Sequence, residues 1–143
     1  MKLVDANVLL YAVNEADPRH AVSVRWLDDA LSGTETVAFA WVVLLAFLRL
    51  STKVGVFPRP LPVGVATGIV RLWTGDGPGV VVEPTVRHLD VLAGLLRESG
   101  TGGNLTSDAH LAALAVEHDA TIISYDRDFL RFPGVRWGEP GPR

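Results

Sequence analysis

The sequence predicts an α/β fold in which helices cover a mostly parallel central sheet of four to five strands. Short apolar segments of strand type alternate along the chain with longer segments whose apolar residues recur at helical spacing. Short connections join these segments, as is typical of strand–helix–strand units. The 143 residues, of which 48% are hydrophobic, are enough for a single compact domain spanning residues 1–143.

The first half of the chain alternates between strand and helix signals. The predicted elements, in order, are a strand at residues 2–4, helices at 7–13 and 17–31, a strand at 36–40, and helices at 41–50 and 65–73. Asp17 is expected to cap the second helix, because Asp followed by Pro in the first turn is a common helix start. Residues 41–50 are apolar on nearly all sides, which predicts a helix packed inside the domain.

The second half repeats this alternation. The predicted elements are a strand at residues 80–83, helices at 85–98 and 104–118, a strand at 121–124 and a short edge strand at 135–137. Thr85 can cap the helix that follows it, and the glycine-rich residues 99–103 are expected to end that helix. In such sheets the ligand site forms at the carboxyl ends of the strands. The acidic residues at that edge are therefore the first candidates for function.

Composition excludes several classes of function. The chain has no cysteine, so disulfides, thiolate metal sites and thiol nucleophiles are excluded. Its longest apolar run is shorter than the roughly 18 residues of a membrane span, and its first residues do not resemble a secretory signal. We therefore expect a cytoplasmic protein without a membrane partner. The net charge of −3 gives no overall attraction for nucleic acid, so any such attraction must be local.

Three aspartates are placed to reach the same edge of the sheet. Asp5 directly follows the first strand, Asp126 comes shortly after the strand at 121–124, and Asp108 lies in the first turns of a helix. Clustered carboxylates repel one another unless a cation neutralises them, and oxygen ligands suit Mg²⁺ or Mn²⁺. An ion held there could polarise a phosphodiester and activate water. Hydrolysis of a phosphodiester fits this set best, although any single aspartate could instead end a strand or cap a helix.

Polar neighbours extend the candidate site. Asp128 could bind the metal through water or cap the short turn after it. Asn7 and Ser124 could orient the acidic groups by hydrogen bonds, as partners of metal ligands do, or could serve as ordinary turn residues. Arg49 and Arg127 are the candidates for local contacts with phosphate.

The histidines and tryptophans are interpreted as structural residues. The histidines lack the close spacing of an imidazole metal site, which predicts positions on the surface or on helix faces; they are His20, His88, His110 and His118. Three of the tryptophans lie in apolar segments, which predicts core or interface anchors rather than platforms for stacked bases. The tryptophans are Trp26, Trp41, Trp73 and Trp137.

Three motifs in order carry a family resemblance. Residues 3–12 (LVDANVLLYA), 108–115 (DAHLAALA) and 124–129 (SYDRDF) together resemble the PIN-domain ribonucleases, and more narrowly the VapC toxins of bacterial toxin–antitoxin pairs. Each motif alone is weak, whereas three in the same order are specific. The resemblance covers essentially the whole chain, including its length and the helix at residues 41–52.

The resemblance implies a PIN-like α/β/α sandwich and cleavage of RNA that depends on Mg²⁺ or Mn²⁺. It also implies an endoribonuclease that is the toxin of a type II pair, a homodimer, and a cognate VapB-like antitoxin whose tail occupies the active-site groove. The family's first, third and fourth acids map to Asp5, Asp108 and Asp126, with Asp128 as an accessory acid. The family's Asn and Ser/Thr beside these acids map to Asn7 and Ser124.

The chain departs from the family pattern at the second acid, where a Glu is usual and Ala46 stands instead. One fewer carboxylate should weaken metal binding and leaves open whether one or two ions are held. An alternative is therefore a non-catalytic module that binds RNA or the antitoxin. A phosphoacceptor domain fits poorly, because Asp5 has no acidic neighbour and no lysine follows Lys53.

Overall fold

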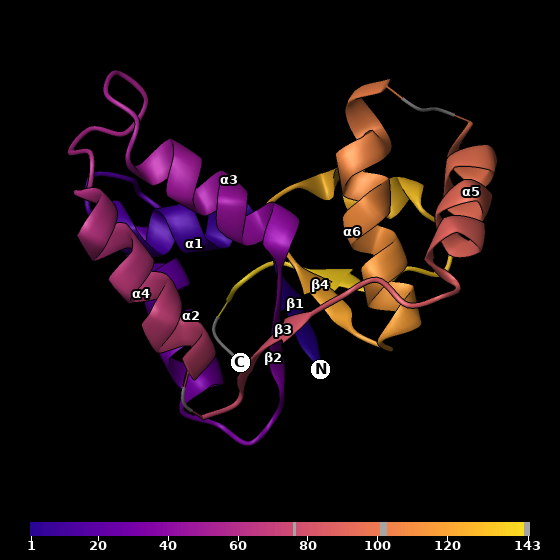
Figure 1. The fold of residues 1–143 in the computed structure, drawn as a ribbon, viewed down its shortest axis with the longest axis horizontal. Coiled ribbons are helices and arrows are strands. Elements are labelled where there is room, and N and C mark those ends of the chain that lie inside the picture. Colours follow the sequence, from indigo (N-terminus) through magenta and orange to yellow (C-terminus); the bar gives the residue numbers. More distant parts are fainter. Residues whose placement is uncertain (76, 101–102, 142–143) are drawn as a thin grey trace.

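The computed structural model describes residues 1–75, 77–100 and 103–141, which form a five-stranded sheet (Figure 1). The strands are β1 (Lys2–Val4), β2 (Val37–Ala40), β3 (Gly79–Val82), β4 (Thr121–Ile123) and β5 (Trp137–Gly138). Their order is β3-β2-β1-β4-β5, and every neighbouring pair is parallel. The predicted α/β fold with a mostly parallel sheet is thus confirmed.

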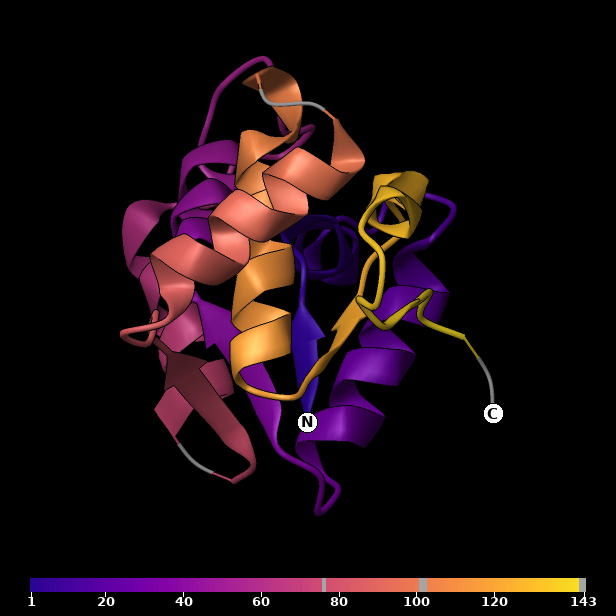
Figure 2. The same cartoon turned by 90° about the vertical axis from the view of Figure 1, so that its right-hand side faces the viewer.

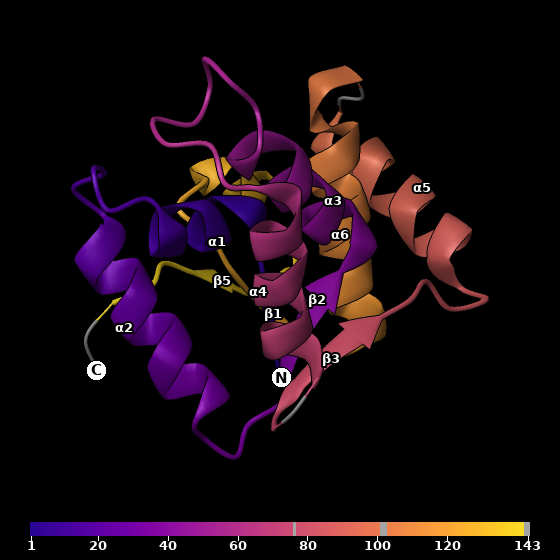
Figure 3. The ribbon, with the colours of Figure 1, turned by 60° about the vertical axis from the view of Figure 1, so that its left-hand side comes forward.

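Helices flank this sheet on both sides. They are α1 (Ala6–Val13), α2 (His20–Leu31), α3 (Trp41–Ser51), α4 (Val63–Gly75), α5 (His88–Ser99) and α6 (Thr106–Glu117), with 3₁₀ turns η1 (Gly103–Leu105) and η2 (Arg127–Arg131). The first four helices lie on one side of the strands, and α5 and α6 lie on the other (Figures 1 and 3). No helix in the described part of the chain has the length and apolarity needed to cross a membrane.

The core follows from the apolar strands and from two helices that pack against them. All four residues of β2 are buried, as expected for a strand covered on both faces. In α6, the run from Leu111 to Ala115 is buried, and its alanines allow close packing. The prediction that residues 41–50 are buried all round is only partly right. Val43, Leu44 and Phe47 are buried, whereas Trp41 and Leu45 on the other face are 49% and 58% exposed.

Two predicted helix caps are wrong by two residues, for the same physical reason. The caps expected at Asp17 and Thr85 are at Arg19 and Arg87, so the helices begin at His20 and His88. Asp17 and Thr85 each accept a hydrogen bond from the backbone N–H two residues later. Their carbonyls accept from His20 and His88, so each side chain closes a turn before the helix.

The boundaries around α6 also differ slightly from the expected ones. The helix predicted from residue 104 starts as the 3₁₀ turn η1 before α6 begins at Thr106. As expected, α5 ends at a glycine, since Gly100 adopts the left-handed conformation with φ of 71°. Residues 101–102 of the predicted glycine-rich terminator lie outside the described residues.

Candidate metal centre

The sheet order explains why residues far apart in sequence meet. Strands β1 and β4 are neighbours and run in the same direction, with Val4 opposite Ile123. The backbone N–H of Asp5 donates to the carbonyl of Ile123 over 3.0 Å. The segment that follows β4 contains Asp126, so the two aspartates lie at the same carboxyl edge of the sheet.

Asp5 is held in place through both of its carboxylate oxygens. Oδ1 accepts from the backbone N–H of Ala6 over 2.8 Å, which makes Asp5 the N-cap of α1. Oδ2 accepts from the hydroxyl of Ser124 over 2.7 Å and from Nδ2 of Asn7 over 3.3 Å. The capping role weighed in the sequence therefore exists. Because an ionised carboxylate offers about four acceptor positions, capping and metal binding are compatible.

A buried hydroxyl links the acidic residues to one another. The side chain of Ser124 belongs to a residue with 0% exposure, and its Oγ accepts from Nδ2 of Asn7 (3.0 Å) and from the backbone N–H of Asp126 (2.9 Å). Asn7 in turn accepts a hydrogen bond from the backbone N–H of Tyr125. The two polar residues chosen from the sequence thus tie the end of β1 to the segment after β4.

Three carboxylates form a compact group. Asp108, Asp126 and Asp128 each offer one oxygen, and these oxygens lie within 4.8 Å of one another. Asp5 is not in this group, although its charge acts on Asp108. The residue that caps the turn η2 is Asp126, whose Oδ1 accepts from the backbone N–H of Asp128 over 2.9 Å. The capping role considered for Asp128 is therefore wrong; instead, its carboxylate lies 3.5 Å from Arg131.

The electrostatics of this edge are those of acids crowded together. Burial raises the pKa of Asp108 to about 6, and the charges of Asp126, Asp5 and Asp128 add to the effect. Burial also raises the pKa of Asp5, against the hydrogen bonds from Ser124 and Ala6 that lower it. A divalent cation would relieve this repulsion. Oxygen donors at these separations suit a hard ion such as Mg²⁺, whose ligands lie at about 2.0–2.1 Å. The residues therefore fit a divalent cation.

The two candidate arginines lie on the surface. The side chain of Arg127 is 73% exposed, 3.9 Å from a carboxylate oxygen of Glu139, and its guanidinium lies 5.7 Å from the centre of the Trp137 ring. Arg49 is exposed in the last turn of α3. Their role as phosphate contacts stays a prediction.

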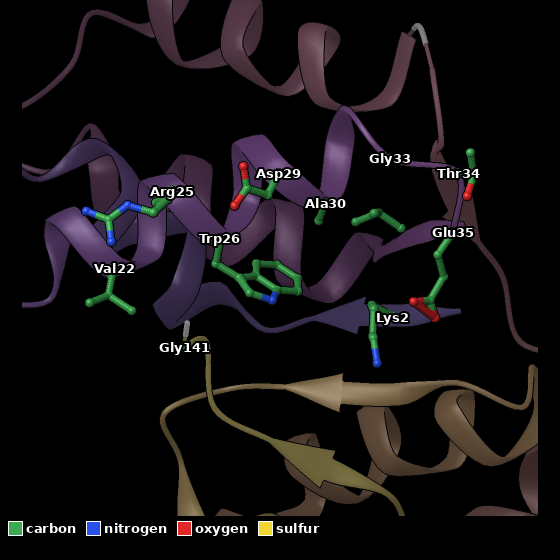
Figure 4. Close-up of a pocket in the computed structure, with 11 residues that line it drawn as sticks. Lys2, Val22, Arg25, Trp26, Asp29, Ala30, Gly33, Thr34, Glu35 and Gly141 are labelled. Carbon is green, nitrogen blue, oxygen red and sulfur yellow. The ribbon is translucent and has the colours of Figure 1, made fainter. Parts of the chain in front are cut away.

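A hollow of about 450 Å³ lies at the other end of the sheet (Figure 4). Its lining residues include Trp26 and Arg25 of α2 and Lys2 at the start of β1. Lys2 is at the start of β1 and Asp5 follows its end, so the hollow and the acidic group lie at opposite ends of the strands. The hollow is not part of the candidate metal centre.

Sequence reasoning missed a second polar cluster. His88 and His110 lie on helix faces as predicted, but their ring nitrogens lie 2.8 Å apart, which the sequence spacing did not indicate. Glu117 completes the cluster through a hydrogen bond with His88. One signal was available, because His110 and Glu117 are two helical turns apart and so share a face of α6.

Comparisons with known proteins agree with the fold and the motifs. The PIN domain family model matches residues 2–135. Ribonuclease VapC37 of Mycobacterium tuberculosis is 63% identical over 140 residues, covering 98% of this chain and 97% of the relative. Ribonuclease VapC33 of the same organism is 38% identical over 140 residues, covering 98% of each chain.

Solved structures show the same fold. VapBC2 from Rickettsia felis, bound to a DNA fragment from its promoter, matches with a TM-score of 0.70 at 15% identity, covering 96% of this chain and 97% of that one. The M. tuberculosis toxin VapC20, which cleaves the sarcin–ricin loop, matches with a TM-score of 0.67 at 21% identity, covering 95% and 99%. The resemblance seen in the sequence motifs is confirmed: the chain belongs to the PIN domain family and, within it, to the VapC ribonucleases.

Proposed function

We propose that this protein is a metal-dependent endoribonuclease, the toxin of a type II toxin–antitoxin pair, built as one PIN-like domain over residues 1–143. The observation that supports it best is the group formed by Asp108, Asp126 and Asp128, whose oxygens lie within 4.8 Å of one another. Asp5 lies at the same edge of the sheet and is hydrogen-bonded through Ser124 to the segment that contains Asp126. The ribonuclease names of the VapC37 and VapC33 relatives point to RNA as the substrate.

The cofactor proposed for this site is Mg²⁺ or Mn²⁺. Asp108, Asp126 and Asp128 would hold the ion, with Asp5 as the fourth acid. When bound, the ion would polarise the phosphodiester and make a water molecule a stronger nucleophile. Because Ala46 stands where the family pattern has an acid, the site has fewer carboxylates than that pattern implies. We therefore propose that the site binds one ion rather than two.

The protein's own residues hold and orient this centre. Ser124 and Asn7 fix the carboxylate of Asp5 through hydrogen bonds, so that little reorganisation is needed when a cation enters. With its pKa near 6, Asp108 loses its proton close to neutral pH, and cation binding favours that loss. Arg49 and Arg127 are proposed to contact phosphates of the RNA. Because the chain has a net negative charge, it needs local positive charge to bind RNA.

The proposed partners follow from the relatives. A solved structure with the same fold, from Klebsiella pneumoniae, is a toxin–antitoxin complex, which supports a VapB-like antitoxin for this chain. We propose a homodimer and a cytoplasmic location, where both the RNA substrate and the antitoxin would be found.

Cleavage of RNA by the purified chain tests the proposal. Antitoxin-free protein is given Mn²⁺ and structured RNAs, and cleavage is compared with that by Asp108→Asn. The control is Asp90→Asn, the same change at an exposed position on α5. We expect EDTA and Asp108→Asn to reduce cleavage to background and Asp90→Asn to leave it unchanged.

A non-catalytic module remains the second candidate, because Ala46 replaces an acid of the family pattern. Measurable RNA binding without any cleavage in Mn²⁺ would support that function and contradict the ribonuclease. Cleavage that persists in EDTA would contradict the metal-dependent mechanism.

A further inference from the structure

A chain of hydrogen bonds joins α5 to α6, which pack side by side (Figure 2). Oε1 of Glu117 accepts from the backbone N–H of Thr85 over 2.9 Å and from its hydroxyl over 2.6 Å. Oε2 of Glu117 is hydrogen-bonded to Nδ1 of His88. Nε2 of His88 then lies 2.8 Å from Nδ1 of His110. The side chains of Glu117 and His88 are 0% and 14% exposed, whereas Thr85 is exposed and His110 is half-buried.

The chemistry of Glu117 sets the proton positions along this chain. Burial would raise the pKa of Glu117, but the hydrogen bonds from Thr85 and His88 outweigh it and lower the pKa below the ordinary value. The carboxylate is therefore ionised and only accepts, so Nδ1 of His88 is the donor. In a neutral imidazole the other nitrogen then has a lone pair and can only accept a hydrogen bond. That lone pair, on Nε2, faces Nδ1 of His110.

We propose that His88 and His110 form a second cation site, selective for a transition metal ion such as Zn²⁺, in which Glu117 orients His88. A carboxylate that accepts the far N–H of an imidazole is the usual partner of a metal-binding histidine. Imidazole nitrogens favour Zn²⁺, Ni²⁺ and Cu²⁺, whereas carboxylate groups like the one at the sheet edge favour Mg²⁺ and Mn²⁺. The two sites would therefore differ in the ion they prefer.

To accept the ion, the two rings must give up the hydrogen bond between them. A tetrahedral Zn²⁺ with bonds of about 2.0–2.1 Å holds its nitrogen ligands about 3.3 Å apart. The two ring nitrogens lie 2.8 Å apart and point at one another, so the rings must separate by roughly half an ångström and each must turn by about 35° for its lone pair to point at the ion. Binding through Nδ1 of His110 moves its proton to Nε2 without changing the charge of the ring. With two protein ligands, water must complete the coordination.

The site is separate from the acidic group although both involve α6. His110 follows Asp108 by two residues, which turns it about 200° around the helix axis. His110 thus faces α5, whereas Asp108 faces the sheet edge. A cation bound by His88 and His110 would cross-link α5 to α6, the helix whose first turn contains Asp108. This role does not require ribonuclease activity.

Binding of Zn²⁺ to the full metal-free chain tests the proposal. Calorimetric titration with Zn²⁺ is done in excess Mg²⁺, which competes with Zn²⁺ for the acidic group. We expect one Zn²⁺ per chain, with at least about tenfold weaker binding in His88→Gln and in His110→Gln, and about tenfold weaker binding in Glu117→Gln. The matched control is His118→Gln, because His118 is hydrogen-bonded to the carbonyl of Glu83 and lies outside the cluster.

A second measurement keeps the test decisive if a variant does not fold. The imidazole ¹⁵N signals of the wild-type chain are followed by NMR during the Zn²⁺ titration. Shifts at Nε2 of His88 and Nδ1 of His110 would support the site. No Zn²⁺ binding by the wild type, or equal binding in His88→Gln, His110→Gln and His118→Gln, would overturn it and leave a hydrogen-bonded contact between two helices.

Discussion

The hydroxyl of Ser124 donates to Oδ2 of Asp5 over 2.7 Å and so joins the ends of two neighbouring strands. The same oxygen accepts from Asn7 and from the backbone of Asp126. All the hydrogen-bonding capacity of one buried hydroxyl is thus used to arrange the acidic edge. Loss of this oxygen should affect both stability and metal binding.

Ser124→Ala is expected to lower the free energy of unfolding by about 1–3 kcal/mol, because it leaves the backbone N–H of Asp126 without an acceptor and Asn7 with only its longer bond to Asp5. It should also weaken Mn²⁺ binding by about 10–100-fold, which is the typical effect of mutating a residue that is hydrogen-bonded to a metal ligand. Urea unfolding and calorimetric titration measure the two quantities.

The matched control is Ser51→Ala. Ser51 is equally buried, but its hydroxyl has no hydrogen-bond partner among the described residues. Its removal should leave stability unchanged or raise it, with no effect on Mn²⁺ binding. Equal losses in the two variants would mean that Ser124 contributes only packing.

Metal binding should depend on pH through Asp108. Its pKa near 6 lies above the ordinary 3.8, so the folded chain holds this proton more tightly than the unfolded chain does. In metal-free protein, the contribution of Asp108 to stability is therefore fully present below about pH 4 and is lost as the pH rises through 6. Mn²⁺ competes with the same proton, so its affinity should fall by up to about tenfold per pH unit below pH 6.

Titrations with Mn²⁺ between pH 5 and pH 8 check this dependence. Asp108→Asn should bind Mn²⁺ more weakly and with a flatter pH profile, because the titrating group is gone. An affinity of the wild type that does not change between pH 5 and pH 7 would exclude Asp108 as a ligand.

The neighbouring carboxylates should raise the pKa of Asp108 by different amounts. The charge of Asp126 raises the pKa of Asp108 more than that of Asp5 does. Asp126→Asn should therefore lower this pKa further than Asp5→Asn, both measured by carboxyl ¹³C NMR of metal-free protein. Asp119→Asn serves as the control, since Asp119 is exposed and paired with Arg136. The reverse order would mean that the carboxylates are arranged differently in solution.

Local pattern predicted most of the sheet and the acidic edge. Asp5 and Asp126 each follow an apolar strand. The alternation of strands and helices already indicates a parallel sheet, so the sequence predicts that both residues lie at the same end of the strands. The pairing of His88 with His110 could not, because it depends on how α5 packs across α6. The exposed face of α3 was also missed, since an all-apolar helix gives no sign of which side meets the core.

Ala46→Glu tests the departure from the family pattern. Residue 46 lies partly exposed on α3, and the family resemblance implies an acid there. If this position reaches the metal centre, a carboxylate there should raise the affinity for Mn²⁺, because it adds a ligand of the preferred type. The same charge should make the metal-free chain less stable, because it adds repulsion to an edge where the pKa of Asp108 is already raised. The two effects have opposite signs, which a general change in packing would not produce.

Thermal unfolding with and without Mn²⁺ measures both effects of Ala46→Glu. Ala46→Gln, which has the same shape without the charge, should show neither effect. If Ala46→Glu and Ala46→Gln behave alike, position 46 lies beyond the reach of the ion, and the set of acids is complete without it.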